Sequence, residues 1–222
     1  MRIDILTLFP NLFNGFVSES IIKRCIEKGL VQINVVDFRK YSKLNNSCVD
    51  DTPYGGGGGM VLRIEPLYDA INDMKKDDEY AKVILLTPDG IPYKQNMAVD
   101  LSKEKHLIFV CGHYEGFDER IRTLCDYEIS IGDYVLTGGE IPAMAISDSI
   151  IRLLDGAITN TSIESESFND NILDYPTYTK PQEFMGMKVP DVLISGDHAK
   201  IRAWRDEKRL ERTKARRPDL LK

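Results

Sequence analysis

Two runs of sequence, Val83-Ile84-Leu85-Leu86 and Leu107-Ile108-Phe109-Val110, decide the fold class of this chain. Each run is apolar at every position, as expected for a parallel strand that is buried on both faces. Two further β-rich runs and two segments with helical spacing accompany them, at 3–9, 31–38, 20–28 and 66–74. Strands that alternate with helices predict an α/β fold with a mostly parallel sheet covered on both faces.

A further strand is predicted at 128–136, where Gly132 interrupts it. A helix is predicted at 141–154, because Pro142 suits its first turn and Gly156 suits its end. The stretch from 159 to 174 then becomes polar and poor in apolar residues, which is typical of a linker.

We therefore expect three parts, at 1–158, 159–178 and 179–222. The first is an α/β domain, the second a flexible interdomain linker and the third a small helical domain.

The net charge of −6 is unevenly distributed along the 222 residues. From Asp197 to Lys222 there are ten Lys or Arg and five Asp or Glu, a local charge of +5, whereas the preceding residues carry −11. An acidic body with a basic tail indicates a polyanionic partner for one part of the chain.

The four cysteines, Cys25, Cys48, Cys111 and Cys125, form no close sequence pair, so we expect reduced core thiols and no metal site. No apolar run is long enough to cross a membrane, and the opening residues MRIDILTLFP predict a first strand and not a signal peptide. These features predict a cytoplasmic protein.

Three segments rich in glycine and polar residues follow predicted strands, at 86–90, 111–116 and 130–140. A tight turn explains any one of them. Because ligands of open α/β sheets bind at the carboxyl ends of the strands, three such turns at one edge predict a small-molecule site.

The segment from Pro53 to Met60 contains five consecutive glycines. It lacks the Lys-Ser/Thr ending of a phosphate-binding loop, and no G-x-G-x-x-G follows a strand. A flexible surface loop and a loop that lies against a ligand both remain open.

Five arginines recur at intervals of three and four residues, a spacing that places them on one face of a helix: Arg202, Arg205, Arg209, Arg212 and Arg216. Such a stripe can bind phosphates. It can equally be a solvated helix, since Asp206, Glu207 and Glu211 can pair with some of the arginines.

The chain resembles the bacterial tRNA (guanine-N1)-methyltransferase family, TrmD, of the SPOUT class of methyltransferases. The resemblance covers nearly the whole chain and is most specific in the segment SIGDYVLTGGEIPA, at 130–143. It also rests on 8–10, 49–57, 111–120, 174–176 and 195–205.

The resemblance implies a deep trefoil knot at one edge of the sheet and a homodimer whose active sites are shared between subunits. It also implies that the domain at 1–158 binds S-adenosylmethionine as methyl donor. The residues so implicated are Leu86, Thr87, Pro88, Gly112, Tyr114, Glu115, Gly116, Ser130, Ile131, Gly132, Asp133, Tyr134, Val135, Leu136, Gly138, Gly139 and Pro142.

The implied substrate is the guanosine immediately 3′ of the anticodon in tRNA, which is methylated at N1. Residues 179–222 are expected to bind tRNA. The residues expected to contact RNA are Tyr54, Gly57, Gly58, Gly59, Asp174, Ser195, His198, Arg202, Arg205, Arg209 and Arg212.

The catalytic base of the family is an Asp in the linker, supported by an Arg on the preceding helix. Arg152 matches the Arg, but Glu166 stands where the family usually has Asp, and Glu is longer by one methylene. We name Glu166 as the base, with Asp170 as the alternative. Thr177 occupies a position where many relatives have His, so no role is carried over to it.

Mg²⁺ as an additional cofactor is compatible with this chemistry, but no residue pattern in the sequence indicates it. Two alternative functions remain at this stage: a methyltransferase of the same fold that acts on another RNA site, and a non-catalytic RNA-binding protein.

Overall fold

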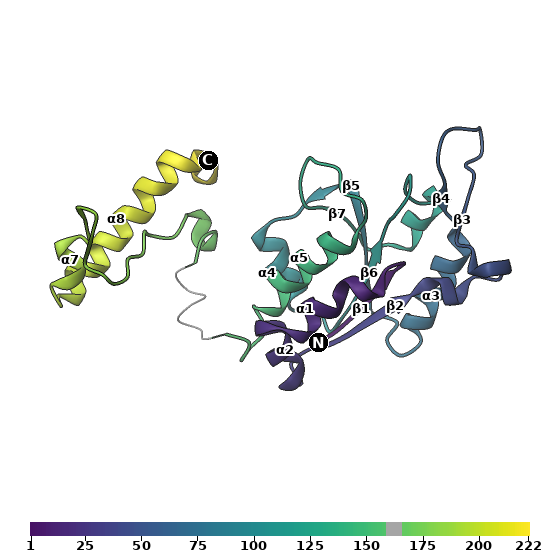
Figure 1. Ribbon diagram of the computed structural model, residues 1–222, viewed down its shortest axis with the longest axis horizontal. Coiled ribbons are helices and arrows are strands. Elements are labelled where there is room, and N and C mark those ends of the chain that lie inside the picture. The colour runs from purple at the N-terminus through teal and green to yellow at the C-terminus, as the bar shows by residue number, and fades with distance from the viewer. Residues whose placement is uncertain (159–165) are drawn as a thin grey trace. The chain divides into compact units, whose positions relative to one another are not determined.

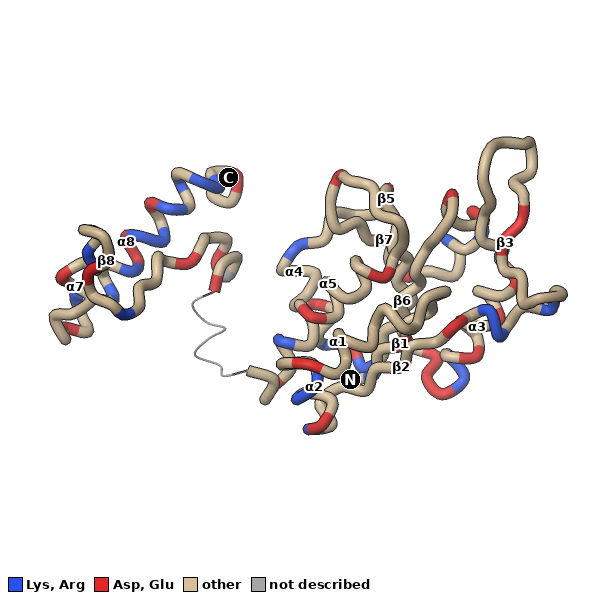
Figure 2. The backbone as a smooth tube through the Cα atoms, in the orientation of Figure 1, with Lys and Arg blue, Asp and Glu red and all other residues tan. Residues whose placement is uncertain are grey.

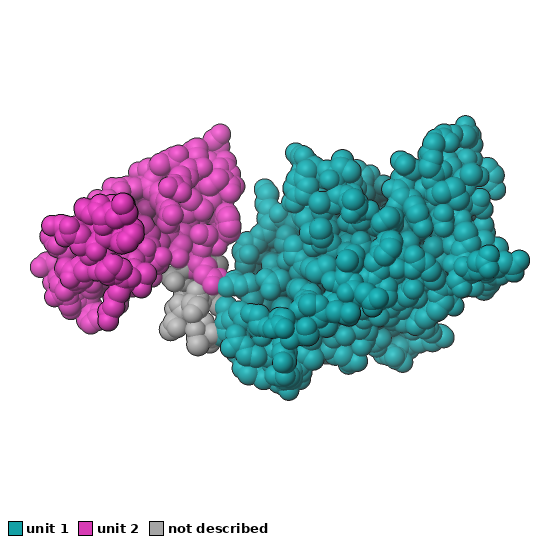
Figure 3. All heavy atoms as spheres, in the orientation of Figure 1, with its two compact units in different colours: residues 1–158 teal, residues 159–222 magenta. Residues whose placement is uncertain are grey.

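The computed structural model describes residues 1–158 and 166–222 of the chain, and it divides the chain into two compact units. Unit 1 comprises residues 1–158 and unit 2 comprises residues 159–222 (Figures 1 and 3). The predicted flexible linker at 159–178 falls partly on residues 159–165, outside the described residues.

Unit 1 is built on a five-stranded sheet with the order β2-β1-β6-β5-β7. All four neighbouring pairs are parallel, which confirms the predicted α/β architecture. The strands are β1 (Arg2–Thr7), β2 (Gln32–Asp37), β5 (Lys82–Pro92), β6 (His106–Cys111) and β7 (Tyr127–Ser130).

The two runs that are apolar at every position lie inside the sheet, since β6 and the first half of β5 are buried on both faces. Helices α2 (Ser20–Glu27), α4 (Gln95–Leu101) and α5 (Glu140–Ile151) contribute apolar residues to one hydrophobic core. Helix α3 (Ile64–Lys75) contributes to the core on the opposite face. Both faces of the sheet are therefore covered, as the sequence predicts.

The predicted strand at 128–136 is wrong in its second half. Strand β7 ends at Ser130, and the chain then turns, with the Tyr134 amide donating to the Gly132 carbonyl at 3.0 Å. Gly132 has a φ of +152°, a backbone conformation that favours glycine. Residues 131–139 therefore form a loop between β7 and α5.

Shorter elements complete unit 1. The antiparallel pair β3 (Asp50–Asp51) and β4 (Val61–Leu62) flanks the glycine-rich segment. The remaining helical segments are α1 (Asn14–Ser18), η1 (Pro10–Phe13), η2 (Phe38–Tyr41), η3 (Asn45–Ser47) and η4 (Glu119–Leu124).

Unit 2 is organised around the helix α8 (His198–Arg216), whose N-terminus is capped by the Asp197 carboxylate. Thr213 is its buried residue, and the Leu173 amide donates to the Thr213 hydroxyl at 2.9 Å. The other elements are η5 (Asn169–Asn171), β8 (Glu183–Phe184), β9 (Met187–Lys188), α7 (Asp191–Ile194) and η6 (Pro218–Leu221).

Within residues 1–158 and 166–222, no helix combines the length and the apolar composition that crossing a bilayer requires.

Candidate functional site

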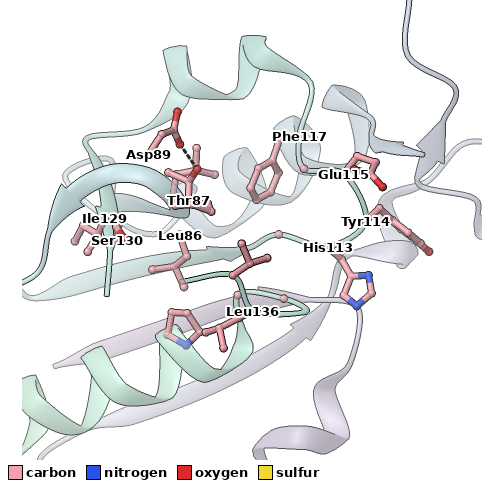
Figure 4. Close-up of a pocket in the computed structure, with 18 of the residues that line it drawn as sticks. Leu86, Thr87, Asp89, His113, Tyr114, Glu115, Phe117, Ile129, Ser130 and Leu136 are labelled. Atoms are coloured by element: carbon pink, nitrogen blue, oxygen red, sulfur yellow. Dashed lines mark hydrogen bonds between the residues drawn. The ribbon is translucent and has the colours of Figure 1, made fainter. Parts of the chain in front are cut away.

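A cavity of about 560 Å³ lies in unit 1 at the carboxyl edge of the parallel sheet. Its walls come from three segments: the irregular stretch of β5 after Leu86, the loop after β6 and the loop after β7 (Figure 4). A volume of this size lies in the range of roughly 300–1,000 Å³ that is typical of small-molecule sites. The cavity forms at the edge where open α/β sheets bind their ligands.

The three glycine-bearing segments singled out from the sequence come together here. Of the residues predicted to bind the cofactor, all except Asp133 line the cavity. The expectation that 86–90 follows a strand is wrong, because β5 continues to Pro92 after an irregular stretch between Leu86 and Ile91. Leu86, just before that stretch, and Ser130, at the end of β7, are almost fully buried, whereas Tyr134 and Val135 are exposed. The site is therefore fixed at its base by the sheet and open along its rim.

Gly139 shows why the innermost loop requires glycine. Its amide donates to the Gly112 carbonyl at 3.0 Å, which brings this loop against the exit of β6. A Cβ atom at Gly139 would lie 2.6 Å from the Cα atom of Cys111, too close for any side chain. Main chain therefore lies against main chain, and the backbone groups of both segments form the cavity wall.

Arg122 is a cavity residue that the sequence analysis did not identify. It forms ion pairs with Asp89 at 2.8 Å, with Glu119 at 2.9 Å and with Glu128. These contacts, the one with Glu119 foremost, raise the pKa of Arg122 above its ordinary value. Arg122 thus ties η4 to β7 and to the irregular stretch of β5 after Leu86. Its partners lie up to 33 residues away, and no local pattern indicates such a role.

Thr87 and Asp89 form a second fixed contact in the same wall, with the Thr87 hydroxyl donating to the Asp89 carboxylate (Figure 4). This hydrogen bond, together with the nearby Arg122, lowers the pKa of Asp89. Asp89 therefore remains ionised at neutral pH.

Aromatic rings surround the other side of the cavity. His113 lies 4.9 Å from the ring of Phe9 and 5.0 Å from that of Tyr114, measured between ring centroids. The Arg39 guanidinium lies over the opposite part of this group, 5.6 Å from the Phe9 centroid. Phe9 and His113 were not among the predicted site residues.

No group of His, Cys, Asp and Glu suited to hold a metal ion occurs among the described residues. All four cysteines are free, but Cys48 and Cys125 are only half-buried, in contrast to the expected core positions. Burial, reinforced by the nearby Glu140, raises the pKa of Cys111 well above its ordinary value. Its thiol therefore stays protonated and is a weak nucleophile.

The glycine-rich segment connects to the middle loop of the cavity. The Glu115 amide donates to the Met60 carbonyl at 3.0 Å, and the Leu62 amide donates to the Gly116 carbonyl at 2.9 Å. A Cβ atom at Gly59 would lie 2.5 Å from the Glu115 side chain. At the far end of the segment, Tyr54 is fully exposed. The segment therefore extends from the cavity rim into solvent.

The residues predicted to carry catalysis are divided between the two units. Arg152 is half-buried and follows the last residue of α5, and its amide donates to the Asp148 carbonyl at 3.1 Å. Glu166 is half-buried and begins the described part of unit 2. Asp170, the alternative base, is exposed and has a φ of +54°.

All five arginines of the predicted stripe lie on α8 (Figure 2). Their environments differ. Arg205 stacks on the ring of Tyr175, with 4.6 Å between the guanidinium carbon and the ring centroid. Arg212 donates to the Asp174 carbonyl at 3.5 Å, and Arg209 is half-buried. Arg202 and Arg216 are exposed. Part of the stripe therefore packs on the segment before α8, and part faces solvent.

The remaining predicted RNA-contact residues occupy turns and a helix end. Asp174 accepts a hydrogen bond from the Tyr175 amide at 2.7 Å, and Ser195 accepts one from the Asp197 amide at 3.2 Å. His198 is the exposed first residue of α8. The ring of Trp204 lies 6.4 Å from that of Tyr178, measured between ring centroids.

Comparison with known proteins gives consistent matches over the whole chain. A family described as "tRNA (Guanine-1)-methyltransferase TrmD" matches residues 1–222. A relative from Brevibacillus brevis is 56% identical over 223 aligned positions, covering 100% of this chain and 91% of the relative. A relative from Staphylococcus carnosus is 54% identical with the same coverage.

A third relative, from Malacoplasma penetrans, is 56% identical over 220 positions, covering 99% of this chain and 96% of its own length. All three relatives are named tRNA (guanine-N(1)-)-methyltransferase.

Proposed function

The chain belongs to the tRNA (guanine-1)-methyltransferase TrmD family, and from this premise we propose that it methylates N1 of the guanosine immediately 3′ of the anticodon in tRNA (position 37). The methyl donor is S-adenosylmethionine. The observation that carries this proposal is the cavity of unit 1, where the irregular stretch of β5 converges with the loops after β6 and β7 at the carboxyl edge of the sheet.

The cavity suits an adenosyl group. Its innermost wall is main chain, since a Cβ atom at Gly139 would lie 2.6 Å from Cys111 Cα, and backbone amides and carbonyls other than the bonded Gly139–Gly112 pair can bind the edges of an adenine and the ribose hydroxyls. The residues that would hold the cofactor are those of the three segments, above all Leu86, Gly112 and Leu136. When bound, the cofactor supplies an activated methyl group.

The chain must make guanine N1 nucleophilic, because N1 carries a proton at neutral pH. We assign the removal of this proton to the Glu166 carboxylate, with Asp170 as the alternative base. Loss of the proton leaves an electron pair on N1, and negative charge develops at guanine O6. That pair would form the new bond to the methyl carbon while the bond from this carbon to the sulfonium sulfur breaks, with its electrons staying on the neutral thioether that leaves. The Arg152 guanidinium provides a cation to stabilise that charge.

The two units divide recognition of the RNA between them. Unit 2 carries the basic helix α8, which supplies phosphate contacts through Arg202, Arg205, Arg209 and Arg212. In unit 1, Tyr54 and Gly57–Gly59 extend from the rim of the cavity, where they can hold a nucleotide that has left its stack. The acidic surface of unit 1 requires no contact with RNA outside this region.

The finer architecture follows from the same family membership. We infer a trefoil knot of the SPOUT type, a small helical tRNA-binding domain at 179–222, and a homodimer in which each active site is completed by the linker and C-terminal domain of the partner subunit. The approach of Gly139 to Cys111 supports the knot, because it brings the loop after β7 against the exit of β6. A cytoplasmic location accords with a tRNA substrate.

The test is a methylation assay of the full chain. An unmodified tRNA transcript is incubated with methyl-labelled S-adenosylmethionine, digested to nucleosides and analysed by mass spectrometry. We expect labelled N1-methylguanosine, and none from a transcript in which adenosine replaces the guanosine at position 37. Labelled product on another base or on a ribose, or no product from folded protein, would overturn the proposal.

A further inference from the structure

Glu140 is a buried carboxylate to which the proposed chemistry assigns no role. It is the first residue of α5 and is only 4% exposed. It does not line the cavity, although the neighbouring Gly138 and Gly139 do. The N-terminus of a twelve-residue helix favours a negative charge, which offsets part of the cost of burying it.

The partner of Glu140 is Thr7, which lies 133 residues away at the end of β1. The Thr7 hydroxyl donates to Glu140 Oε1 at 2.7 Å and accepts a hydrogen bond from the Phe9 amide at 2.9 Å. Thr7 is fully buried. A hydroxyl has one proton to donate. The Thr7 hydroxyl donates it to Glu140, and its oxygen accepts the hydrogen bond from the Phe9 amide.

Within 1–158 and 166–222, Glu140 has no Lys, Arg or His as an ion-pair partner. The hydrogen bond with Thr7 is therefore the specific contact that fixes this carboxylate. A buried acceptor left without such a contact is destabilising, because it has lost its hydrogen bonds to water.

The second oxygen of Glu140 lies against the cavity loop. A Cβ atom at Gly138 would collide with Glu140 Oε2, and it would also lie 3.2 Å from the Gly112 carbonyl oxygen. On the next residue, Gly139 is bonded to the Gly112 carbonyl through its amide. The backbone at 138–139 is thus enclosed between the exit of β6 and the Glu140 side chain.

We propose that the Thr7–Glu140 hydrogen bond is a positioning contact for cofactor binding. It connects the end of β1 to the loop that forms the inner wall of the cavity, and so fixes the backbone groups at 138–139 in the place where they bind the cofactor. Thr7 and Glu140 act through this backbone and do not touch the ligand. The inference rests on the proposed function, in which this cavity binds S-adenosylmethionine.

The hydrogen bond and the negative charge of Glu140 predict different behaviour for two variants. Glu140→Gln keeps an oxygen that can accept from Thr7 but removes the charge. Glu140→Ala removes both. If the hydrogen bond, and not the charge, positions the loop, Glu140→Gln retains cofactor binding and Glu140→Ala loses it.

The experiment measures the affinity of the full-length protein for S-adenosylmethionine by isothermal titration, without RNA. We expect Glu140→Ala and Thr7→Val each to raise the Kd about tenfold or more, and Glu140→Gln and Thr7→Ser to stay within about threefold of wild type. The double variant Thr7→Val/Glu140→Ala should bind about as weakly as the weaker single variant, because both substitutions remove one interaction. At saturating cofactor, the kcat of the single variants should return close to that of wild type.

Ile150→Val is the matched control, since Ile150 is fully buried on the same helix. It should lower the melting temperature and leave the Kd unchanged, which separates positioning from general stability. Thr7→Ser and Glu140→Gln keep the test decisive if the larger substitutions impair folding. Ala and Val variants that bind like the Ile150→Val control would overturn the inference, as would a Gln variant as weak as Ala. Failure of the wild type to bind would instead overturn the proposed function.

Discussion

The two units differ in how much of their structure is held by a hydrophobic core. Of the described residues that are buried, all lie in unit 1 except Thr213. Unit 2 is held by polar and aromatic contacts, such as Arg205 on Tyr175 and the Leu173 amide on Thr213. The segments that line the cavity of unit 1 are therefore anchored to a packed sheet. Unit 2, with Thr213 as its one buried residue among those described, has little apolar burial of its own.

Charge is also unevenly distributed, but it changes sign within unit 2, near the start of α8, and not at the boundary between the units. The residues from Asp197 onward carry a net charge of +5, whereas the rest of the chain carries −11 (Figure 2). We therefore assign cofactor binding to unit 1 and most of the RNA affinity to unit 2. The predictions below test this division, beginning with the largest expected effect.

Glu166→Ala should lower the rate of methyl transfer without changing the affinity of the cavity for the cofactor. If Glu166 of unit 2 is the general base, kcat should fall by about 10²–10⁴-fold, while the affinity for S-adenosylmethionine stays at the wild-type value. Single-turnover assays with tRNA measure the first quantity and titration calorimetry the second. Glu166→Asp restores the residue usual in the family and serves as the conservative control. Wild-type turnover by the Ala variant would exclude Glu166 as the base and point to Asp170.

Gly139→Ala should have the reverse effect. The added Cβ atom would lie 2.6 Å from Cys111 Cα, so the loop must move, and a displacement of about 1 Å is expected to weaken cofactor binding roughly a hundredfold. Gly15→Ala is the matched control, because nothing lies within 4 Å of a Cβ atom there. Calorimetry with S-adenosylmethionine compares the two. Equal affinities would show that the cofactor does not depend on this backbone.

Arg202→Gln should weaken tRNA binding through the salt-dependent part of the affinity. Arg202 is exposed on α8, so its loss should lower the slope of log K against log salt by about 1 and leave cofactor affinity unchanged. Lys103→Gln, an exposed position of unit 1, is the control and should leave the slope unaltered. Filter binding at several salt concentrations provides the measurement. An equal change in both variants would contradict the assignment of most of the RNA affinity to unit 2.

Asp4 gives unit 1 a dependence on pH that does not come from the cavity. Burial raises the pKa of Asp4, but hydrogen bonds from His106, Arg2 and Asn34 outweigh it, so the pKa lies below its ordinary value of about 3.9. Because the folded pKa is the lower one, this stabilisation is present above the unfolded pKa and is lost as the pH falls through the folded pKa.

Asp4→Asn should therefore lower the free energy of unfolding at neutral pH by about 1–3 kcal/mol and flatten its decline in acid. Asp197→Asn, which keeps a capping side chain on α8, is the control. Urea unfolding at pH 7 and pH 4, monitored by circular dichroism, distinguishes the two. A decline in acid that is as steep in Asp4→Asn as in the wild type would assign the pH dependence to other groups.

The sequence indicates those features that depend on local pattern. Strands β5 and β6 were predictable because every residue of their cores is apolar, and the cavity loops after β6 and β7 because glycines follow those strands. The third wall segment was placed after a strand, whereas it belongs to β5. The second half of the strand predicted at 128–136 was wrong, because the turn at Gly132 ends β7 early.

Features that depend on contacts between distant residues were not predictable. Arg122 joins three segments of the cavity wall, and Thr7 reaches Glu140 across 133 residues. From the local sequence, Arg122 would be interpreted as a member of a surface ion pair and Thr7 as the end of a strand. Only the folded sheet brings the partners together.

Hydrogen–deuterium exchange of the full chain, with and without S-adenosylmethionine, tests the central claim most directly. We predict slower exchange on cofactor addition at the amides of 112–116 and 131–139, and unchanged exchange along α8. Unaltered exchange in those loops, or protection confined to unit 2, would contradict the assignment of the cofactor to the cavity of unit 1.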